Sequence, residues 1–163
     1  MKKYSKEDQK LMGTWAADCA ERVLPFFEEA YPEDDRPRNA LETCRTWVRT
    51  GVFRMAEIRG ASLSSHAAAR AVKGNGPTLF AARAAGQAVA TAHVAQHAYG
   101  GALYALKAIA ATDPANAEKN VTKERDWQSR HLPKHLRDEV MNRIVIEKRS
   151  KGIFITIQKD ENY

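Results

Sequence analysis

The sequence predicts an all-α protein, folded as a compact multi-helix bundle of antiparallel helical hairpins with a short β element at the C-terminus. Apolar residues recur at spacings of three and four along most of the chain, and helix-ending residues interrupt that pattern at intervals. The composition of the 163 residues, 44% hydrophobic and 28% charged, is typical of a globular domain. We expect a single domain over residues 1–163, with a helical core over 5–150 and a C-terminal extension over 151–163.

The first predicted helix begins at Ser5, because Ser5 with Asp8 three residues later resembles a capping box. An apolar stripe follows at helical spacing, formed by Trp15, Cys19, Val23 and Phe26 or Phe27. Pro25 falls inside this pattern. It is expected to kink or split the helix, since it lacks an N–H and its ring clashes with the preceding turn.

A second helix is predicted to begin near Asp34 or Asp35 and to end at Gly51. Either aspartate can cap its first turn, where Pro37 is also well placed. Gly51 suits the left-handed conformation that commonly ends a helix. One side of this segment is apolar and consists of Leu41, Cys44, Trp47 and Val48.

Further helices are expected along the middle of the chain. The pattern over 53–72 is helical and tolerates Gly60, and the sequence KGNGP at 73–77 ends it. The alanine-rich stretch 81–111 predicts one or two helices, with a break at Gly100-Gly101. Two more helices are expected, one beginning at Asp113-Pro114 and the other near Pro133.

Only the C-terminal end has the composition of a strand. Residues 153–157 (IFITI) are β-branched or aromatic. Because an isolated strand is unstable, it needs a partner. That partner is either RIVIEK at 143–148, in a hairpin through RSKG, or a second chain, which would give a homodimer.

Charge and hydropathy narrow the classes of function. The basic first residues have no apolar run behind them, and no stretch approaches the roughly 20 apolar residues that span a bilayer. We therefore expect a cytoplasmic protein without membrane association, whose two cysteines are reduced core thiols. The net charge of +6 favours acidic partners, either nucleic acid or an acidic protein face.

The most unusual feature is the pair His93 and His97, which would share one face of a helix. A metal site would need a third ligand, for which His66 is the obvious candidate, and a fourth such as Cys19, Cys44 or Asp18. The zinc-protease signature is missing, since Val94 follows His93 where that signature has a glutamate.

A catalytic role for the histidines would need a nucleophile poised against an imidazole. The sequence contains no phosphate-binding loop, nucleophile elbow or paired-carboxylate motif. We therefore favour a buried polar network, in which Asp18, Glu21 or Tyr104 accepts or donates hydrogen bonds with His93 and His97. The predicted network comprises Asp18, Glu21, His66, His93 and His97, and neither a metal ion nor a cofactor is expected.

A second candidate site is the charged sequence PEDDRPR at 32–38. Helix capping and local ion pairs explain its charges, since an aspartate at a cap followed by proline is common at helix starts. The alternative is a loop that faces a partner. In that interpretation the partner-binding residues are Asp34, Asp35, Arg36 and Arg38.

Several stretches together resemble a known family. They are WAADCAERVLPFFEEAYPEDDRPRNALETCRTW, HAAARA, AARAAGQAVATAHVAQHAYGGALYALKA and WQSRHLP. From about Trp15 to about Leu136 they are similar to the all-helical immunity proteins of bacterial polymorphic-toxin systems, the fifth class and its relatives. The resemblance implies a cytoplasmic protein without catalytic activity that neutralises a toxin domain by binding it. The C-terminal GIFITIQKDENY lies outside the shared pattern.

Three hypotheses follow, and the first is favoured: an immunity protein that binds a toxin domain. The second is a nucleic-acid-associated basic helical protein that uses residues 61–112, which contain basic residues but no carboxylate. Four bases over that length make a thin phosphate-binding stripe, so nucleic acid is not the expected partner. These bases are Arg70, Lys73, Arg83 and Lys107. The third hypothesis is a metal enzyme built on His66, His93 and His97.

Overall fold

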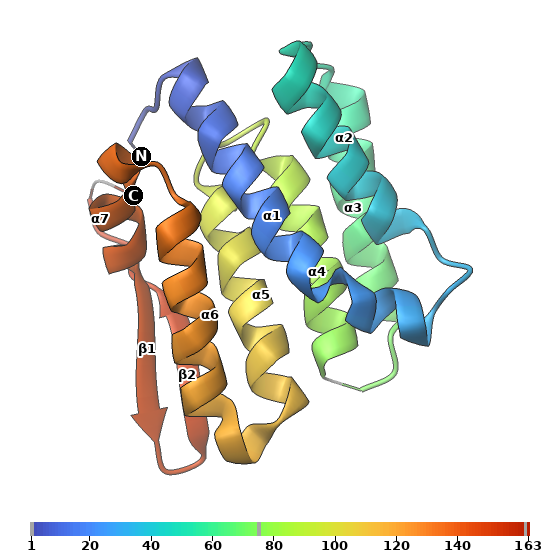
Figure 1. Cartoon of the computed structure of the whole chain (residues 1–163). Helices are drawn as coiled ribbons and strands as arrows, with labels where there is room; N and C mark the ends of the chain where they lie inside the picture. The colour runs from blue at the N-terminus through green and yellow to red at the C-terminus, as the bar shows by residue number, and fades with distance from the viewer. Residues whose placement is uncertain (1, 75, 162) are drawn as a thin grey trace.

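The computed structural model describes residues 2–74, 76–161 and 163, which form seven α-helices, a 3₁₀ turn and a two-stranded sheet (Figure 1). The elements are α1 (Lys6–Ala30), α2 (Arg36–Thr50), α3 (Met55–Ala71), α4 (Pro77–Ala90), α5 (His97–Thr112), η1 (Pro114–Asn116), α6 (Ala117–His131), α7 (Lys134–Arg143), β1 (Ile144–Arg149) and β2 (Gly152–Ile157). The predicted all-α class with a short C-terminal β element is confirmed.

The alanine-rich helices α4 and α5 lie at the centre of the bundle. Helix α4 contacts α1, α2, α3 and α5, while α5 contacts α1, α4, α6 and β2. Figure 1 shows α1 lying across this pair, with α2 and α3 on one side and α6 and the hairpin on the other. Small side chains permit this close packing. Within the carboxylate-free stretch, α4 and α5 contribute many buried residues, but Arg70 and Lys73 are exposed and Arg83 and Lys107 are half-buried.

Two tryptophans anchor α1 and α2 in the core. Trp15 is 1% exposed, and its indole N–H donates to the carbonyl of Gln128 in α6 at 2.9 Å. Trp47 of α2 packs against α1 at Gly13, where there is no Cβ in its way. The thiols of Cys19 and Cys44 are free and buried, as predicted, and burial raises the pKa of both, that of Cys44 to about 12.

Several helix ends follow the local signals in the sequence. The Ser5 hydroxyl accepts the backbone N–H of Asp8 at 3.0 Å, which caps α1 as expected. Asp34 accepts the backbone N–H of Arg36 at 3.2 Å at the start of α2. Gly51 ends α2 with φ +70°, a conformation that side chains rarely adopt.

Helix α1 runs through Pro25 without splitting, and Figure 1 shows its last turns bending away from its initial direction. The predicted break at Gly100-Gly101 was wrong, because α4 and α5 are separated by residues 91–96 and both glycines lie inside α5. Their role is close packing. A Cβ at Gly101 would lie 3.2 Å from the Cβ of Ala16 in α1.

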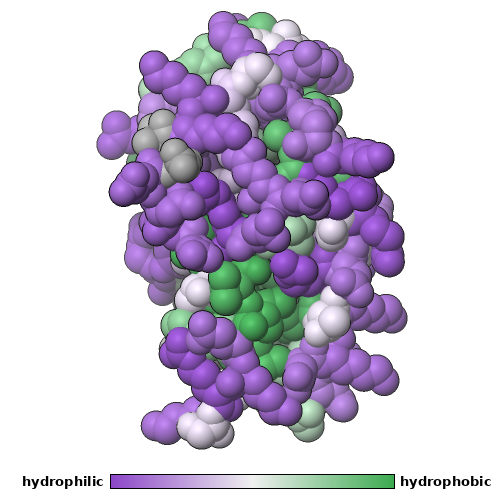
Figure 2. All heavy atoms as spheres, turned by 90° about the vertical axis from the view of Figure 1, so that its left-hand side faces the viewer, coloured by the Kyte–Doolittle hydropathy of each residue, from purple (hydrophilic) through white to green (hydrophobic). Residues whose placement is uncertain are grey.

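The C-terminal strand pairs within the chain. β1 and β2 are antiparallel, with Ile144 opposite Ile157 and Ile146 opposite Ile155, so of the two pairings expected for 153–157 the structure shows the hairpin with 143–148. Figure 2 views the side of the molecule that carries α7 and the hairpin; it is mostly hydrophilic, with an apolar patch in its lower half. Within the described ranges, no helix is both long and apolar enough to cross a membrane.

Candidate functional site

The three histidines singled out in the sequence line one pocket of about 410 Å³ between α3 and α4. We call it the histidine pocket. One wall is the face of α3 on which residues recur every three or four positions, namely Met55, Ile58, Arg59, Ser62, Leu63 and His66. The other side consists of Gln87 and Ala90 of α4, then His93 and His97.

Two serine hydroxyls of α3, one of them from Ser62 in the pocket wall, hold α3 against α4. Ser62 donates to the carbonyl of Gly86 at 2.9 Å, and Ser65 donates to the carbonyl of Ala82 at 2.8 Å. Gly86 lets the ring of His66 lie directly on α4, because a Cβ there would be 2.9 Å from His66 Nε2. The pocket therefore depends on a glycine facing a histidine across two helices.

His97, the first residue of α5, is held by Gln87. Its Nδ1 lies 2.8 Å from Gln87 Oε1, and burial together with the neighbouring His93 lowers the pKa of His97. The glutamine side chain itself rests on Gly100, where a Cβ would lie 2.7 Å from Oε1. Gly100 thus provides the space that the hydrogen bond needs.

His66 is the most perturbed titratable group of the pocket. Burial, then the charges of Arg83 and Arg70 and the nearby His97, lower its pKa to about 4. Its Nδ1 is buried and makes no hydrogen bond to any described residue. At neutral pH the bottom of the pocket is therefore polar but uncharged.

The expectation that His93 is buried on the same helix face as His97 was wrong. His93 is exposed and lies in the turn 91–96, where its ring stacks on Phe53 with centroids 6.5 Å apart. The turn forms because the side-chain amide of Gln9 in α1 donates to the carbonyls of Thr91 and Ala92, at 2.8 and 3.2 Å. These bonds satisfy carbonyls just beyond the end of α4, so the helix can stop there.

The predicted single network is instead divided between two places. Asp18 and Glu21 lie on α1 and face α2. The guanidinium nitrogens of Arg45 in α2 lie 3.0 Å from Asp18 Oδ1 and 3.5 Å from Glu21 Oε2. The histidines are joined to Gln87, and neither Asp18, Glu21 nor Tyr104 is the partner of His97. The sequence predicts that the acidic residues and the histidines lie on different helices, but it does not show how those helices pack. It therefore could not show that the two groups lie in different places.

Three charged side chains of the turn at 33–38 form ion pairs, either within the turn or with α1. Arg36 donates to both carboxylate oxygens of Asp34, at 2.8 and 2.6 Å, and these hydrogen bonds hold the pKa of Asp34 below its usual value. Arg38 bridges Glu21 and Glu28 of α1, while Asp35 is exposed and makes no capping hydrogen bond. Most of these charges therefore help to fix the α1–α2 turn, and their binding role stays a prediction.

The chemistry of the histidine pocket does not resemble a metal or nucleophile site. Among residues 2–74, 76–161 and 163, no group of three or more His, Cys, Asp or Glu side chains is placed to hold a metal ion. The Ser62 hydroxyl donates to a backbone carbonyl rather than to an imidazole. What the pocket offers is an apolar cavity with hydrogen-bonding groups at its base, as in many binding sites.

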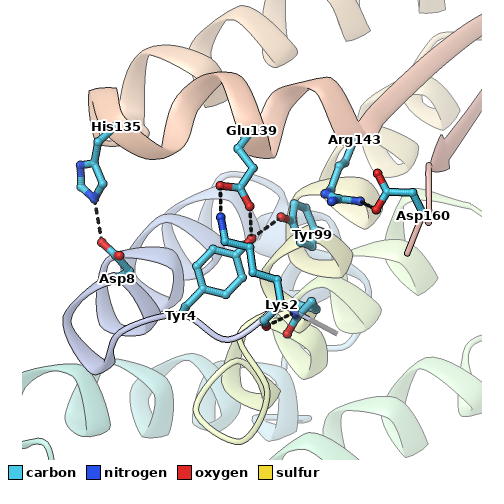
Figure 3. Close-up of polar contacts among 9 residues, drawn as sticks. Lys2, Tyr4, Asp8, Tyr99, His135, Glu139, Arg143 and Asp160 are labelled. Atoms are coloured by element: carbon cyan, nitrogen blue, oxygen red, sulfur yellow. Dashed lines mark hydrogen bonds and ion pairs between the residues drawn. The ribbon is translucent and has the colours of Figure 1, made fainter. Parts of the chain in front are cut away.

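A polar cluster that the sequence did not reveal joins the two ends of the chain (Figure 3). Glu139 of α7 accepts from Lys2 at 2.6 Å and from the Tyr4 hydroxyl at 2.7 Å, and that hydroxyl is 2.9 Å from the Tyr99 hydroxyl. One turn away on α7, His135 lies 2.7 Å from Asp8. Burial alone would raise the pKa of Glu139, but the bonds from Lys2 and Tyr4 lower it.

These contacts fasten α7 and the hairpin to the N-terminal segment. The sequence shows that His135, Glu139 and Arg143 are spaced by four residues, but it does not show their partners. The partners of His135 and Glu139 are more than a hundred residues away, and the partner of Arg143 follows the hairpin. We call α7, β1 and β2 the C-terminal unit.

The described residues form a helical bundle whose histidine pocket lies between α3 and α4. Residues 2–135 match the family model described as Imm-5 like putative immunity protein, and the chain therefore belongs to this immunity protein family. No curated protein and no solved structure matches the chain. The match contains the whole histidine pocket and ends at the start of α7, so most of the C-terminal unit lies outside it.

Proposed function

We propose that this chain binds a cognate toxin domain and neutralises it by binding alone, without catalysing a reaction. The observation that carries the proposal is the family match over residues 2–135. Such a protein would work by covering the toxin's active site or by holding the toxin in an inactive conformation. A few anchor side chains, typically aromatic or arginine, would supply most of the binding energy.

The physical properties of the bundle fit this role. A helical bundle with a dense alanine-rich centre is rigid, so little conformational entropy is lost when it binds. Its buried, unpaired thiols fit a reducing compartment such as the cytoplasm, where we expect the protein to act. Binding at the turn Asp34, Asp35, Arg36 and Arg38 would require a partner to exchange existing ion pairs, which favours a surface elsewhere.

The test is to purify the tagged chain from its native host at moderate salt and to identify co-purifying proteins by mass spectrometry. The proposal predicts a toxin domain, and the two purified proteins should then form a stable complex of defined stoichiometry. Recovery of nucleic acid instead, with binding that weakens steeply as salt rises, would support the nucleic-acid hypothesis. Failure of the purified pair to form a complex would refute the immunity role.

A further inference from the structure

Exposed apolar side chains cluster beside the histidine pocket. Of the large hydrophobic side chains that the described residues expose, four lie between positions 52 and 63 and one lies elsewhere. They are Val52 (55%), Phe53 (43%), Met55 (44%) and Leu63 (54%), and then Phe154 (42%). Met55 and Leu63 line the pocket itself, and Phe53 stacks on His93 at its edge. We call Phe53, Met55 and Leu63 the apolar rim; such a group is typical of an interaction site.

The charged side chains that line the two pockets beside this rim are basic. A second pocket of about 280 Å³ shares His93 with the first and is lined by Phe53, Lys6 and Lys10. Arg59 lines the histidine pocket, and no aspartate or glutamate lines either of the two. The only acidic residue of α3 is Glu57, whose carboxylate oxygen Oε1 lies 3.0 Å from Arg54 Nη1. Glu57 lines a different pocket.

This charge pattern favours an acidic protein partner over a second copy of the same chain. A symmetric contact between two copies of the face would bring the positive charges of Lys6, Lys10 and Arg59 on one copy near those on the other, which is unfavourable. An acidic partner would gain from the same three cations and would meet no carboxylate on either pocket wall. The surface therefore suits a negatively charged protein segment that also carries an apolar side chain.

We propose, on the basis of the immunity function proposed above, that the histidine pocket and the apolar rim dock an acidic segment of the toxin domain. The segment inserts one large apolar side chain into the pocket, against Ile58, Leu63 and the imidazole of His66. Its carboxylates face Arg59 in the wall of the histidine pocket, and Lys6 and Lys10 in the neighbouring pocket that shares His93. A volume of about 410 Å³ accepts a large side chain, while Gln87 and His66 supply polar contacts at the base.

The hairpin offers an internal comparison. Phe154 of β2 is as exposed as Phe53, but the guanidinium of Arg149 lies 3.7 Å from the centre of its ring and already covers one face. It also lies outside the part of the chain that matches the family. Phe154 is therefore a matched control for Phe53: the same residue type with the same exposure on another surface.

The first test measures the affinity of the reconstituted complex with the purified toxin domain by titration calorimetry. Phe53→Ala combined with Leu63→Ala is expected to weaken binding by about 30-fold or more, the loss that marks an interface hot spot. Phe154→Ala should change it less than about threefold. All three side chains are exposed, so the variants should keep the wild-type circular dichroism spectrum.

The charge is tested through association rates. Lys10→Gln with Arg59→Gln should slow association severalfold at low salt, whereas Lys151→Gln in the exposed hairpin turn should have little effect. Replacing Phe53 by the photo-crosslinker p-benzoylphenylalanine should capture a toxin peptide rich in Asp and Glu. The same replacement at Phe154 should capture none.

The outcomes separate the two proposals. A complex that forms normally but tolerates loss of Phe53 and Leu63, or that is weakened by Phe154→Ala instead, overturns the docking surface and leaves the immunity function intact. A crosslinked peptide without acidic residues overturns the proposed chemistry of the partner. If the wild-type chain binds no toxin domain, the immunity function fails and this inference fails with it.

Discussion

Glycines that face side chains across helices decide the shape of the histidine pocket, and alanine substitutions should reveal this. Gly60, inside α3, has no neighbouring atom within 4 Å of an added Cβ, so Gly60→Ala should stabilise the protein by about 0.5–1 kcal/mol through helix propensity. Gly86→Ala should lack this gain, because its Cβ would lie 2.9–3.1 Å from three ring atoms of His66. Urea midpoints of the two variants make the comparison; an equal gain in both would mean that His66 does not rest on α4.

The lowered pKa of His66 predicts a pH dependence of stability. In the unfolded chain the imidazole binds a proton below its usual pKa of 6.5, whereas in the folded protein it stays neutral down to about 4. The unfolded state thus binds more protons in this window, and the free energy of unfolding should fall as pH falls from 7 toward 4.5. His97 acts in the same direction, and Arg70 and Arg83 are the charges that face His66.

The measurement is the urea midpoint between pH 7 and 5, above the range where carboxylates dominate. His66→Gln should make that dependence shallower. An unchanged slope in this variant would show that His66 is solvated in the folded protein.

Helix α7 depends on the N-terminal segment for its position, which makes Tyr4 a sensitive residue. Tyr4→Phe removes the hydroxyl that links Glu139 to Tyr99 and should cost about 1–3 kcal/mol, since the Tyr99 hydroxyl loses its partner and Glu139 keeps only the bond from Lys2. Tyr104→Phe is the control, because the hydroxyl of Tyr104 makes no hydrogen bond to any described residue and its ring still stacks on Phe80. Equal chemical denaturation curves for the two variants would exclude the proposed link.

Elements whose ends depend on residues close in sequence could be predicted, whereas elements that depend on distant residues could not. The cap at Ser5, the end at Gly51 and the C-terminal hairpin depend on neighbours in sequence and could be predicted. The turn at 91–96 depends on Gln9, which is more than eighty residues away, and an alanine-rich sequence with good helix propensity gave no local sign of it. That missed turn is also why His93 was assigned to the wrong environment.

The candidate site was predictable in part. His66, His93 and His97 stand out because polar groups in an alanine-rich helical sequence are unusual, and all three line the histidine pocket. The apolar rim was missed, since nothing in the sequence distinguishes exposed Phe53, Met55 and Leu63 from core residues before the packing of α3 is known. The family resemblance over residues 15–136 agrees with the match over 2–135.

At the scale of the whole molecule, the C-terminal unit and the family region should unfold together. Leu136, Val140 and Ile144 belong to the same apolar core as Trp15 and Trp47, and Arg125 of α6 donates to the carbonyl of Met141 at 2.9 Å. Tryptophan fluorescence and far-ultraviolet circular dichroism should therefore give coincident urea transitions. Two separate transitions would mean that the C-terminal unit is an independent domain.

The central claim is that this chain protects a cell by binding a toxin domain, and growth rescue tests it most directly. The toxin domain that co-purifies with the chain is expressed in a susceptible bacterium, alone or with the wild-type chain, and the growth of each culture is measured. We expect arrest with the toxin alone and growth when the chain is present. Arrest in both cultures, with the chain soluble and abundant, would contradict it.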